Sequence, residues 1–378
     1  MATNNNDKTL NVPHLRFPEF SGEWKETTLG KIAEITKGSG ISKDQLSEQG
    51  SPCILYGELY TKYKSEIINE VYSRTELDSS PLVKSKANDV IIPCSGETAI
   101  DISTARCVLF NNILLGGDLN IIRLKYDDGG FFAYQLNGAR KKDIARVAQG
   151  VSVVHLYGEN LKHIRVYHPA IEEQKKIARL LSLIDERITT QNKIIEKLES
   201  LIRGLCLKLV SQGIPNTALN TCLECHSSIL QEKSVTTDGK YPVYGAAGIC
   251  GYSNTPEASG DSILIIKDGA SVGATFYVSG EYSAIGTLNR LTARSGCSLR
   301  YLYYCLKIFD FSQYKTGQTI PHIYFRDYGI AKIWRPSLAQ QEHIAGILTS
   351  IDTKIQMERS LLERLTIQKR FLLQKMFI

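Results

Sequence analysis

The sequence predicts an α+β protein with two mixed α/β domains, separated by two long antiparallel coiled-coil helices and related by a pseudo-two-fold axis. Three observations predict this fold class. A 61-residue segment occurs twice, each copy contains a long heptad pattern, and each copy follows a region of short β-type runs. Two copies favour a pseudo-symmetric molecule over a solenoid, because a solenoid needs more repeats to bury a continuous core.

Composition narrows the class of protein. The chain has 378 residues, 43% of them hydrophobic, which is enough for two to four globular units. The net charge of +6 leans towards a polyanionic partner without establishing one. Residues 1–11 are polar and Asn-rich and predict a disordered tail, and neither an export signal nor a membrane span is visible. Nine scattered cysteines predict free thiols in a reducing compartment, so we expect a cytoplasmic protein.

The repeat is the most informative feature. Residues 150–210 align with residues 317–377 at a constant shift of 167, without a gap, and 16 of the 61 positions are identical. The matches include Gly150 with Gly317, His155 with His322, Pro169 with Pro336, Gln174 with Gln341, and Ile184-Asp185 with Ile351-Asp352.

After its proline, each copy predicts one long helix, over residues 169–213 and 336–378. Apolar residues recur in steps of three and four, which is a heptad seam that requires a partner helix. We expect a subunit or helix–helix interface at Ile177, Leu181, Ile184, Ile188, Ile195, Leu198, Ile344, Leu348, Ile351, Ile355, Leu362 and Leu365. Polar Gln191, Glu358 and Lys369 interrupt the seams and can fix register. An ordinary amphipathic helix would share the periodicity, but two matched seams of this length favour pairing with each other.

The regions before the helices, residues 12–168 and 214–335, predict the two α/β domains. Val90-Ile91-Ile92 and Ile263–Ile266 are typical of buried strands, and residues 130–140 and 299–309 of helices. The domains resemble each other weakly: Leu29–Glu34 can be aligned with Leu219–Glu224, and Asp89–Ile92 with Asp261–Leu264. The helices stayed alike while the domains diverged, which suggests one scaffold that carries two readers of different targets.

Three segments carry a resemblance to a known family. The opening Pro13–Trp24 resembles the start of the specificity subunits of type I restriction–modification enzymes. Pro169–Ala178 and Arg335–Ala345, each followed by a leucine and an Ile-Asp pair, resemble their helical regions. The resemblance covers nearly the whole chain, and the doubled pattern of proline, glutamine, Ile-Ala and Ile-Asp is its specific part.

The resemblance implies a non-catalytic, sequence-specific DNA-binding subunit. Each domain would be a target recognition domain that reads one half of a split target in double-stranded DNA, with the helices as spacers. Two methyltransferase subunits would dock on the helices, and two restriction subunits can join them. The chain itself would hold no cofactor, because S-adenosylmethionine and ATP with magnesium would belong to the partners. The resemblance implies no membrane partner.

Candidate DNA contacts combine basic, aromatic and amide side chains in loops. Arg and Lys suit guanine edges or phosphates, and Asn and Gln suit adenine. A surface loop that is merely solvated is the competing interpretation for each residue. The candidates are Lys37, Ser39, Lys43, Tyr60, Lys62, Lys64, Gln149 and Ser152 in the first domain, and Lys240, Tyr244, Tyr252, Asn254, Lys267, Arg290, Gln318 and Thr319 in the second.

Apparent catalytic motifs have simpler explanations. Cys222-Leu-Glu-Cys225-His226 matches a haem-attachment pattern, but both cysteines align with apolar Ile32 and Ile35, which predicts core packing rather than a metal or haem site. The spacing of Glu34 and Lys37 occurs in nucleases and also arises easily by chance. No phosphate-binding loop or dinucleotide fingerprint is present.

Two other functions stay open at this point. A coiled-coil adaptor whose domains bind protein would show no salt-sensitive affinity for DNA. A self-contained nuclease or methyltransferase would show metal-dependent or methyl-donor-dependent activity in the isolated chain. Neither function requires the doubled heptad helix, so the repeat favours the specificity subunit.

Overall fold

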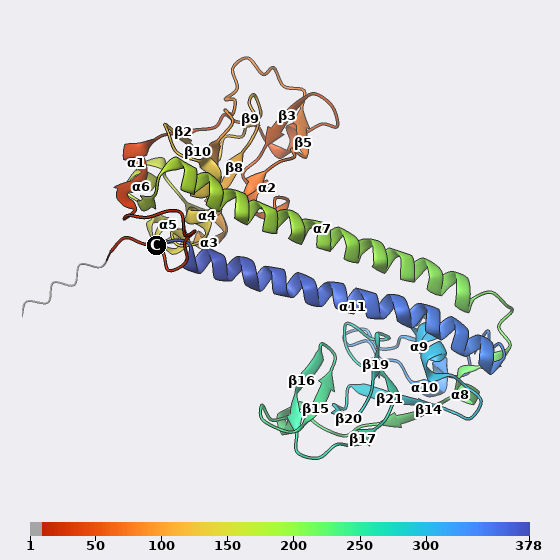
Figure 1. Ribbon diagram of the computed structural model, residues 1–378. Coiled ribbons are helices and arrows are strands. Elements are labelled where there is room, and N and C mark those ends of the chain that lie inside the picture. Colours follow the sequence, from red (N-terminus) through yellow and green to blue (C-terminus); the bar gives the residue numbers. More distant parts are fainter. Residues whose placement is uncertain (1–9) are drawn as a thin grey trace, which may run out of the picture. The chain divides into compact units, whose positions relative to one another are not determined.

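The computed structural model describes residues 10–378, so most of the predicted tail over residues 1–11 lies outside the described residues. The chain divides into two compact units. Unit 1 consists of residues up to 191 and from 361 onwards, and unit 2 of residues 192–360. Each long helix therefore contributes one part to each unit (Figure 1). The predicted fold class is confirmed in its elements, two domains of mixed helix and sheet with long helices.

The domain of unit 1 is built around a five-stranded sheet in the order β2-β10-β6-β8-β4, beside a three-stranded sheet β5-β3-β9. Strands β1 and β12 form a separate antiparallel pair, as do β7 and β11. The elements are β1 (Lys25–Thr28), α1 (Leu29–Ile32), β2 (Ala33–Lys37), η1 (Lys43–Gln45), β3 (Ser51–Ile54), α2 (Glu58–Thr61), β4 (Ile67–Ile68), β5 (Ser73–Thr75), β6 (Asp89–Pro93), β7 (Ser95–Gly96), α3 (Ala99–Ile102), β8 (Arg106–Val108), β9 (Leu114–Leu115), β10 (Leu119–Leu124), α4 (Gly129–Asn137), α5 (Lys141–Val147), β11 (Val154–His155), α6 (Gly158–Lys162) and β12 (Arg165–His168).

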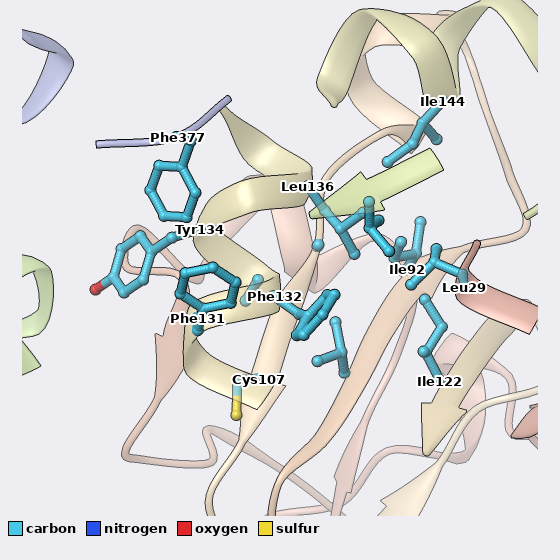
Figure 2. Packing of buried hydrophobic residues seen from close by; sticks show 14 of the residues in the cluster. Leu29, Ile92, Cys107, Ile122, Phe131, Phe132, Tyr134, Leu136, Ile144 and Phe377 are labelled. Atoms are coloured by element: carbon cyan, nitrogen blue, oxygen red, sulfur yellow. The ribbon is translucent and has the colours of Figure 1, made fainter. Parts of the chain in front are cut away.

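Helix α4 supplies the centre of the unit 1 core. Its residues Phe131, Phe132, Tyr134 and Leu136 are all fully buried. Figure 2 shows Phe132 directed towards the strand residues of the sheet, while Phe131 and Tyr134 lie towards Phe377. Apolar residues on several faces of one short helix are typical of an element that is enclosed on all sides. The helix ends at Asn137, three residues earlier than the sequence predicts, because Gly138 departs from helical geometry.

The domain of unit 2 has a four-stranded sheet in the order β14-β21-β18-β19 and a second sheet β16-β15-β20-β17. Strands β13 and β22 pair antiparallel. The elements are β13 (Thr217–Ala218), α8 (Leu219–Cys222), β14 (Leu223–Ser227), η2 (Glu232–Ser234), β15 (Tyr241–Gly245), β16 (Gly248–Ser253), β17 (Ala258–Ser259), β18 (Ser262–Ile266), β19 (Thr275–Val278), β20 (Glu281–Ala284), β21 (Leu288–Ala293), α9 (Leu299–Lys307), η3 (Ser312–Tyr314), α10 (Phe325–Tyr328) and β22 (Lys332–Ile333).

The two domains share one topology despite their divergent sequences. In both, the first long strand pairs with the last, which pairs with the central strand. The alignment of Leu29–Glu34 with Leu219–Glu224 is correct, since α1 and α8 end at its matched positions. The alignment of Asp89 with Asp261 is wrong by one residue. Asn120 pairs with Lys37 and Ile92, and Asn289 pairs with Ser227 and Ile265, so Asp89 corresponds to Ser262.

The two long helices are α7 (Ile171–Val210) and α11 (Leu338–Lys375), drawn as uninterrupted coils in Figure 1. The start of α7 packs with the end of α11 in unit 1, and the end of α7 packs with the start of α11 in unit 2, so the helices run antiparallel. Each of the twelve expected interface residues is buried or half-buried. Gln191 and Glu358 are buried as well.

A repeated glutamine joins each long helix to its domain. Gln174 accepts a hydrogen bond from the Asp128 backbone N–H at 2.9 Å and donates to the Pro169 carbonyl. Gln341 accepts from the Ser298 N–H at 2.9 Å and donates to the Pro336 carbonyl. Asp128 and Ser298 are the N-caps of α4 and α9, whose first amides lack intrahelical partners. The conserved spacing of proline and glutamine in the repeat therefore has a structural cause.

Candidate nucleic-acid interface

The first group of candidate residues lines a cleft of about 1100 Å³ in unit 1. Its walls are the Gly-rich loop after β2 and the segment that carries α2, which bring together Lys43, Tyr60 and Lys62. Gly38 lets the loop approach the sheet, because a Cβ there would lie 2.0 Å from the Gly116 carbonyl oxygen. Ser39 accepts a hydrogen bond from the Val83 N–H at 2.7 Å, so its hydroxyl holds the loop.

The cations of this cleft have different environments. Lys43 is exposed and forms the first residue of η1. Lys62 donates to the buried Glu58 carboxylate at 2.6 Å, and Glu58 also accepts from the Leu55 N–H. Lys62 therefore neutralises a structural carboxylate, which the sequence did not reveal. Burial raises the pKa of Tyr60, so its hydroxyl stays protonated and can donate a hydrogen bond at neutral pH.

A second group lies in the loop between Gln149 and His155. The two residues exchange backbone hydrogen bonds of 2.9 and 2.7 Å, which closes the loop into a small hairpin. Gly150 has φ +122°, a conformation that favours glycine, and a Cβ there would lie 2.1 Å from the Val153 carbonyl oxygen. Gln149 and Ser152 are exposed on this loop. Lys37 and Lys64 lie outside both groups and are exposed, and Lys64 donates to the Thr61 carbonyl.

The matching loop of unit 2 carries the next group. Thr316 and His322 exchange backbone hydrogen bonds of 2.9 and 2.7 Å, and Gln318 and Thr319 are exposed between them. The Lys267 carbonyl accepts from the Ile323 N–H, which brings Lys267 beside this loop. His322 lies 2.6 Å from the Asp268 carboxylate, an ion pair when the imidazole is protonated.

The remaining candidates of unit 2 divide between two places. Lys240, Tyr244, Tyr252 and Asn254 belong to the β15–β16 hairpin or its immediate ends. Lys240 lies over the ring of Tyr241, and Tyr244 packs edge-on against buried Tyr282, so Tyr244 has a structural contact as well. Arg290 is separate from this hairpin and lines a small pocket with His226 and Tyr282.

Side chains that resemble a metal or haem site pack in the core instead. Cys222 is buried in the apolar core of unit 2, Cys225 packs against that core, and His226 hydrogen-bonds to Thr292. The prediction of core packing is confirmed for both cysteines. Within residues 10–378, no group of three or more His, Cys, Asp or Glu side chains is placed to hold a metal ion. Among the same residues, no helix combines the length and apolar character that a bilayer span requires.

Comparisons with known proteins identify the family of this chain. The model of the type I restriction modification DNA specificity domain matches residues 21–200 and again residues 224–366. The chain belongs to this family. This specificity subunit is 24% identical to a putative type I specificity subunit of Mycoplasma pneumoniae, over 68% of either chain. It is 34% identical to a putative type I restriction enzyme specificity subunit of Methanocaldococcus jannaschii, over 55% of this chain and 50% of that relative.

The fold of the specificity subunit agrees with a solved structure. The crystal structure of the S subunit of a type I restriction–modification system from M. genitalium superposes with a TM-score of 0.74, at 20% identity, over 97% of this chain and 99% of that one. The predicted family and the predicted role in DNA recognition are confirmed. The relatives are named as specificity subunits, in agreement with a non-catalytic chain whose partners are DNA and other subunits of such a system.

Proposed function

We propose that this chain reads a bipartite target in double-stranded DNA, with one half-site for each domain. The observation that carries the proposal is the pair of matched loops, 149–155 and 316–322. They are closed by the same backbone bonds and share a hydroxyl, Ser152 or Thr319, yet they present their exposed amides at different positions, Gln149 in one and Gln318 in the other. Equal frameworks with different base-reading groups suit two different half-sites.

Within each domain, we assign separate tasks to cations and amides. Lys43, together with Tyr60, would hold the phosphate backbone along the unit 1 cleft, since phosphate contacts position a protein on the duplex. Lys240 would do so at the β15–β16 hairpin, and Lys267 beside the loop of unit 2, whereas the amide of Asn254 would read bases. The exposed amide of Gln318 can form a bidentate pair with adenine. Lys62 is a weaker candidate, because Glu58 already occupies its ammonium group.

Membership in the family of specificity domains supports a proposal on the partners as well. We propose that two methyltransferase subunits dock on the specificity subunit and that restriction subunits join this complex. S-adenosylmethionine and ATP with magnesium would bind to those partners. A protein that directs modification of chromosomal DNA would work in the cytoplasm, where its nine cysteines remain free thiols.

The test is target selection from a random duplex library by the chain co-expressed with its methyltransferase subunit. Enrichment of two short blocks around a fixed unread gap is expected. Replacing residues 12–168 with the corresponding domain of another specificity subunit should then change one block and leave the other intact. A folded complex that selects no split motif would contradict the proposal and favour the adaptor.

A further inference from the structure

In unit 1, an extended segment covers the edge of the main sheet. Strand β4 lies parallel to β8, and the carbonyl of Glu66, just before β4, accepts a hydrogen bond from the Cys107 N–H at 2.8 Å. The Glu66 carboxylate lies 2.5 Å from the Lys369 ammonium, which also contacts Asp185 at 2.6 Å. The segment thus completes the sheet and supplies a second carboxylate to a buried lysine.

In unit 2, no segment among the described residues covers the equivalent edge. Cys107 pairs with Val90 in the same way as Tyr277 pairs with Ile263, so β19 corresponds to β8. Strand β19 ends the order of its sheet in the part of the chain that the structure describes. The alternating ladder of antiparallel strands directs the N–H groups of every second residue away from the sheet. Tyr277, which corresponds to Cys107, is the residue whose N–H would pair with an added strand.

The lysine of unit 2 also lacks a second carboxylate. Asp352 is the repeat equivalent of Asp185, and its cation is Lys307 of α9, at 3.1 Å. Among the ion pairs of residues 10–378, Asp352 is the single carboxylate partner of Lys307. Among the described residues, none therefore takes the place of Glu66 beside Lys307.

A polar pocket of about 690 Å³ occupies this place. Four cations line it, Arg203, Arg300, Lys307 and Arg359, against two carboxylates, Glu199 and Asp352. Arg359 contacts Glu199 at 2.5 Å, which leaves Arg203 and Arg300 without a carboxylate at ion-pair distance in the described chain. The lining thus has an excess of two positive charges, which is partly offset by Asp261, a carboxylate outside the lining that interacts electrostatically with Arg300 and accepts a hydrogen bond from Tyr277 at 2.6 Å. A concave site with a net positive charge favours an anionic partner.

The residue opposite the edge strand indicates the side chain that would enter. In unit 1 this position on α4 is Gly130, where a Cβ would lie 3.2 Å from the terminal carbon of Ile67. In unit 2 the equivalent residue of α9 is Arg300, whose guanidinium lies 3.6 Å from the centre of the Tyr277 ring. Unit 1 thus accepts an apolar residue after Glu66, whereas unit 2 presents a cation at the same place.

We propose that β19 and this pocket bind an extended acidic segment of a partner protein. The segment adds a strand parallel to β19, with one carboxylate at Lys307 and the next at Arg300. Strand addition explains the open edge, and charge complementarity explains the two arginines. A DNA phosphate could meet the arginines but would leave the strand edge without a partner, so the structure favours a peptide. The proposal is independent of which DNA sequence the domains read.

The probe is a fluorescein-labelled peptide that copies residues 64–71 of this chain with the change Ile67→Glu. Its fluorescence anisotropy is measured against the full-length chain at low salt. Binding is expected. Arg300→Gln should weaken it about tenfold, since the charge-assisted hydrogen bond to one carboxylate is lost, and Arg203→Gln should weaken it by less, since Arg203 attracts the segment by its charge alone. Lys208→Gln is the matched control, an exposed cation on the same helix as Arg203 but outside the pocket, and should leave the affinity unchanged.

Two further probes separate strand addition from simple charge attraction. A peptide with Gln at positions 66 and 67 should bind at least about tenfold more weakly. In a parallel ladder, alternate residues donate to the neighbouring strand. The N–H of position 68 would donate to the edge strand, whereas the N–H of position 67 would point away from it. Backbone N-methylation at position 68 should therefore abolish binding, and methylation at position 67 should not. Equal effects of the two methyl groups would contradict strand addition.

Two results with the peptides would overturn the proposal. The first is that the peptide does not bind to a chain that unfolds at the wild-type temperature. The second is that the Gln peptide binds as tightly as the acidic peptide. The third is that the Arg203→Gln and Arg300→Gln variants lose affinity for a random 20-base-pair duplex while their affinity for the peptide is unchanged. This result would identify the pocket as a binding site for DNA phosphate. Selection of DNA by the same variants distinguishes this failure from failure of the proposed function, because the split motif should stay intact.

Discussion

The two units hold the same aspartate of the repeat in different ways. In unit 1, Asp185 is buried and contacts Lys369, and it accepts hydrogen bonds from Tyr134 at 2.8 Å and Ser65 at 3.0 Å. In unit 2, the equivalent Asp352 is half-buried and pairs with Lys307, a residue of α9. One sequence pattern thus supports a buried network in one unit and a partly solvated ion pair in the other. Breaking the buried network should cost far more, because it leaves charges without water or a partner.

The largest expected effect comes from removing the buried cation. Lys369→Met leaves Glu66 and Asp185 buried without their ammonium partner, so the free energy of unfolding of unit 1 should fall by about 3–5 kcal/mol. Burial raises the pKa of Glu66, and Lys369 opposes this rise, so the variant should take up a proton at Glu66. Urea unfolding followed by the fluorescence of Trp24, in a Trp334→Phe background, measures the change in unit 1.

The matched change in unit 2 is Lys307→Met. Its ion pair is partly exposed, and such pairs contribute about 0–1 kcal/mol, so the loss should stay within this range. Unfolding is followed by Trp334 in a Trp24→Phe background. Equal losses in the two units would show that burial does not distinguish the two aspartates, and the comparison would fail.

A contact that the two units share should destabilise both units when it is removed. Gln174→Leu leaves the backbone N–H of Asp128 without its acceptor, and Gln341→Leu does the same to the N–H of Ser298, which should cost about 1–3 kcal/mol each. Gln174 also donates to Asp127 at 2.8 Å, so its loss should be the larger of the two. The same pair of single-tryptophan backgrounds provides the measurement. A loss confined to one unit would mean that the repeated glutamine does not have one role.

The matched loops 149–155 and 316–322 allow the two units to be compared by their DNA binding. Gln318→Ala should change the preferred bases of one half-site only, with a cost of about 1–3 kcal/mol for the lost bidentate contact. Ser152→Ala in the equivalent loop should affect the other half-site, by less, because a hydroxyl forms fewer hydrogen bonds. Selection from a random duplex library by each variant gives both results. Changes that spread over both blocks would contradict the assignment of one half-site to each domain.

The smallest expected effect concerns the reactivity of the cysteines, whose exposure differs between the two domains. Burial raises the pKa of Cys53 and Cys94 in unit 1 to about 11, so about one thiol in a thousand is ionised at pH 8. Cys250 of unit 2 is exposed. Iodoacetamide at pH 8 should therefore label Cys250 first, and Cys250→Ser should remove this fast phase. Rapid labelling of Cys53 or Cys94 in the folded chain would show that the unit 1 domain opens readily.

The two long helices show what can be predicted from local patterns in the sequence. The seam from Ile177 to Leu198 and the equivalent seam from Ile344 to Leu365 are readable because helical side chains return to the same face every three to four residues. The β-type runs Val90–Ile92 and Ile263–Ile266 likewise indicated β6 and β18. Strand register was harder. Asp89 and Asp261 share a residue type but not a position, and a slip by one residue exchanges the two faces of a strand.

The candidate DNA contacts were likewise predictable from the sequence only in part. The basic and aromatic character of Lys43, Tyr60 and Lys62 was evident in the sequence, and the structure places all three on one cleft. The ion pair between Lys62 and Glu58 links neighbours in the sequence, but its burial depends on the strands around it. The pocket beside Lys307 gave no signal in the sequence, because its walls come from α7, α9, α11 and β19.

The sequence by itself determined the duplicated plan of the protein, its long helices, and the family to which it belongs. These features depend on periodicity and on motifs within short stretches of chain. Only the tertiary structure decided which lysine reaches each repeated aspartate, Lys369 from α11 in one unit and Lys307 from α9 in the other. The physical reason is that burial and the pairing of charges depend on residues that lie far apart in the sequence and meet when the chain folds.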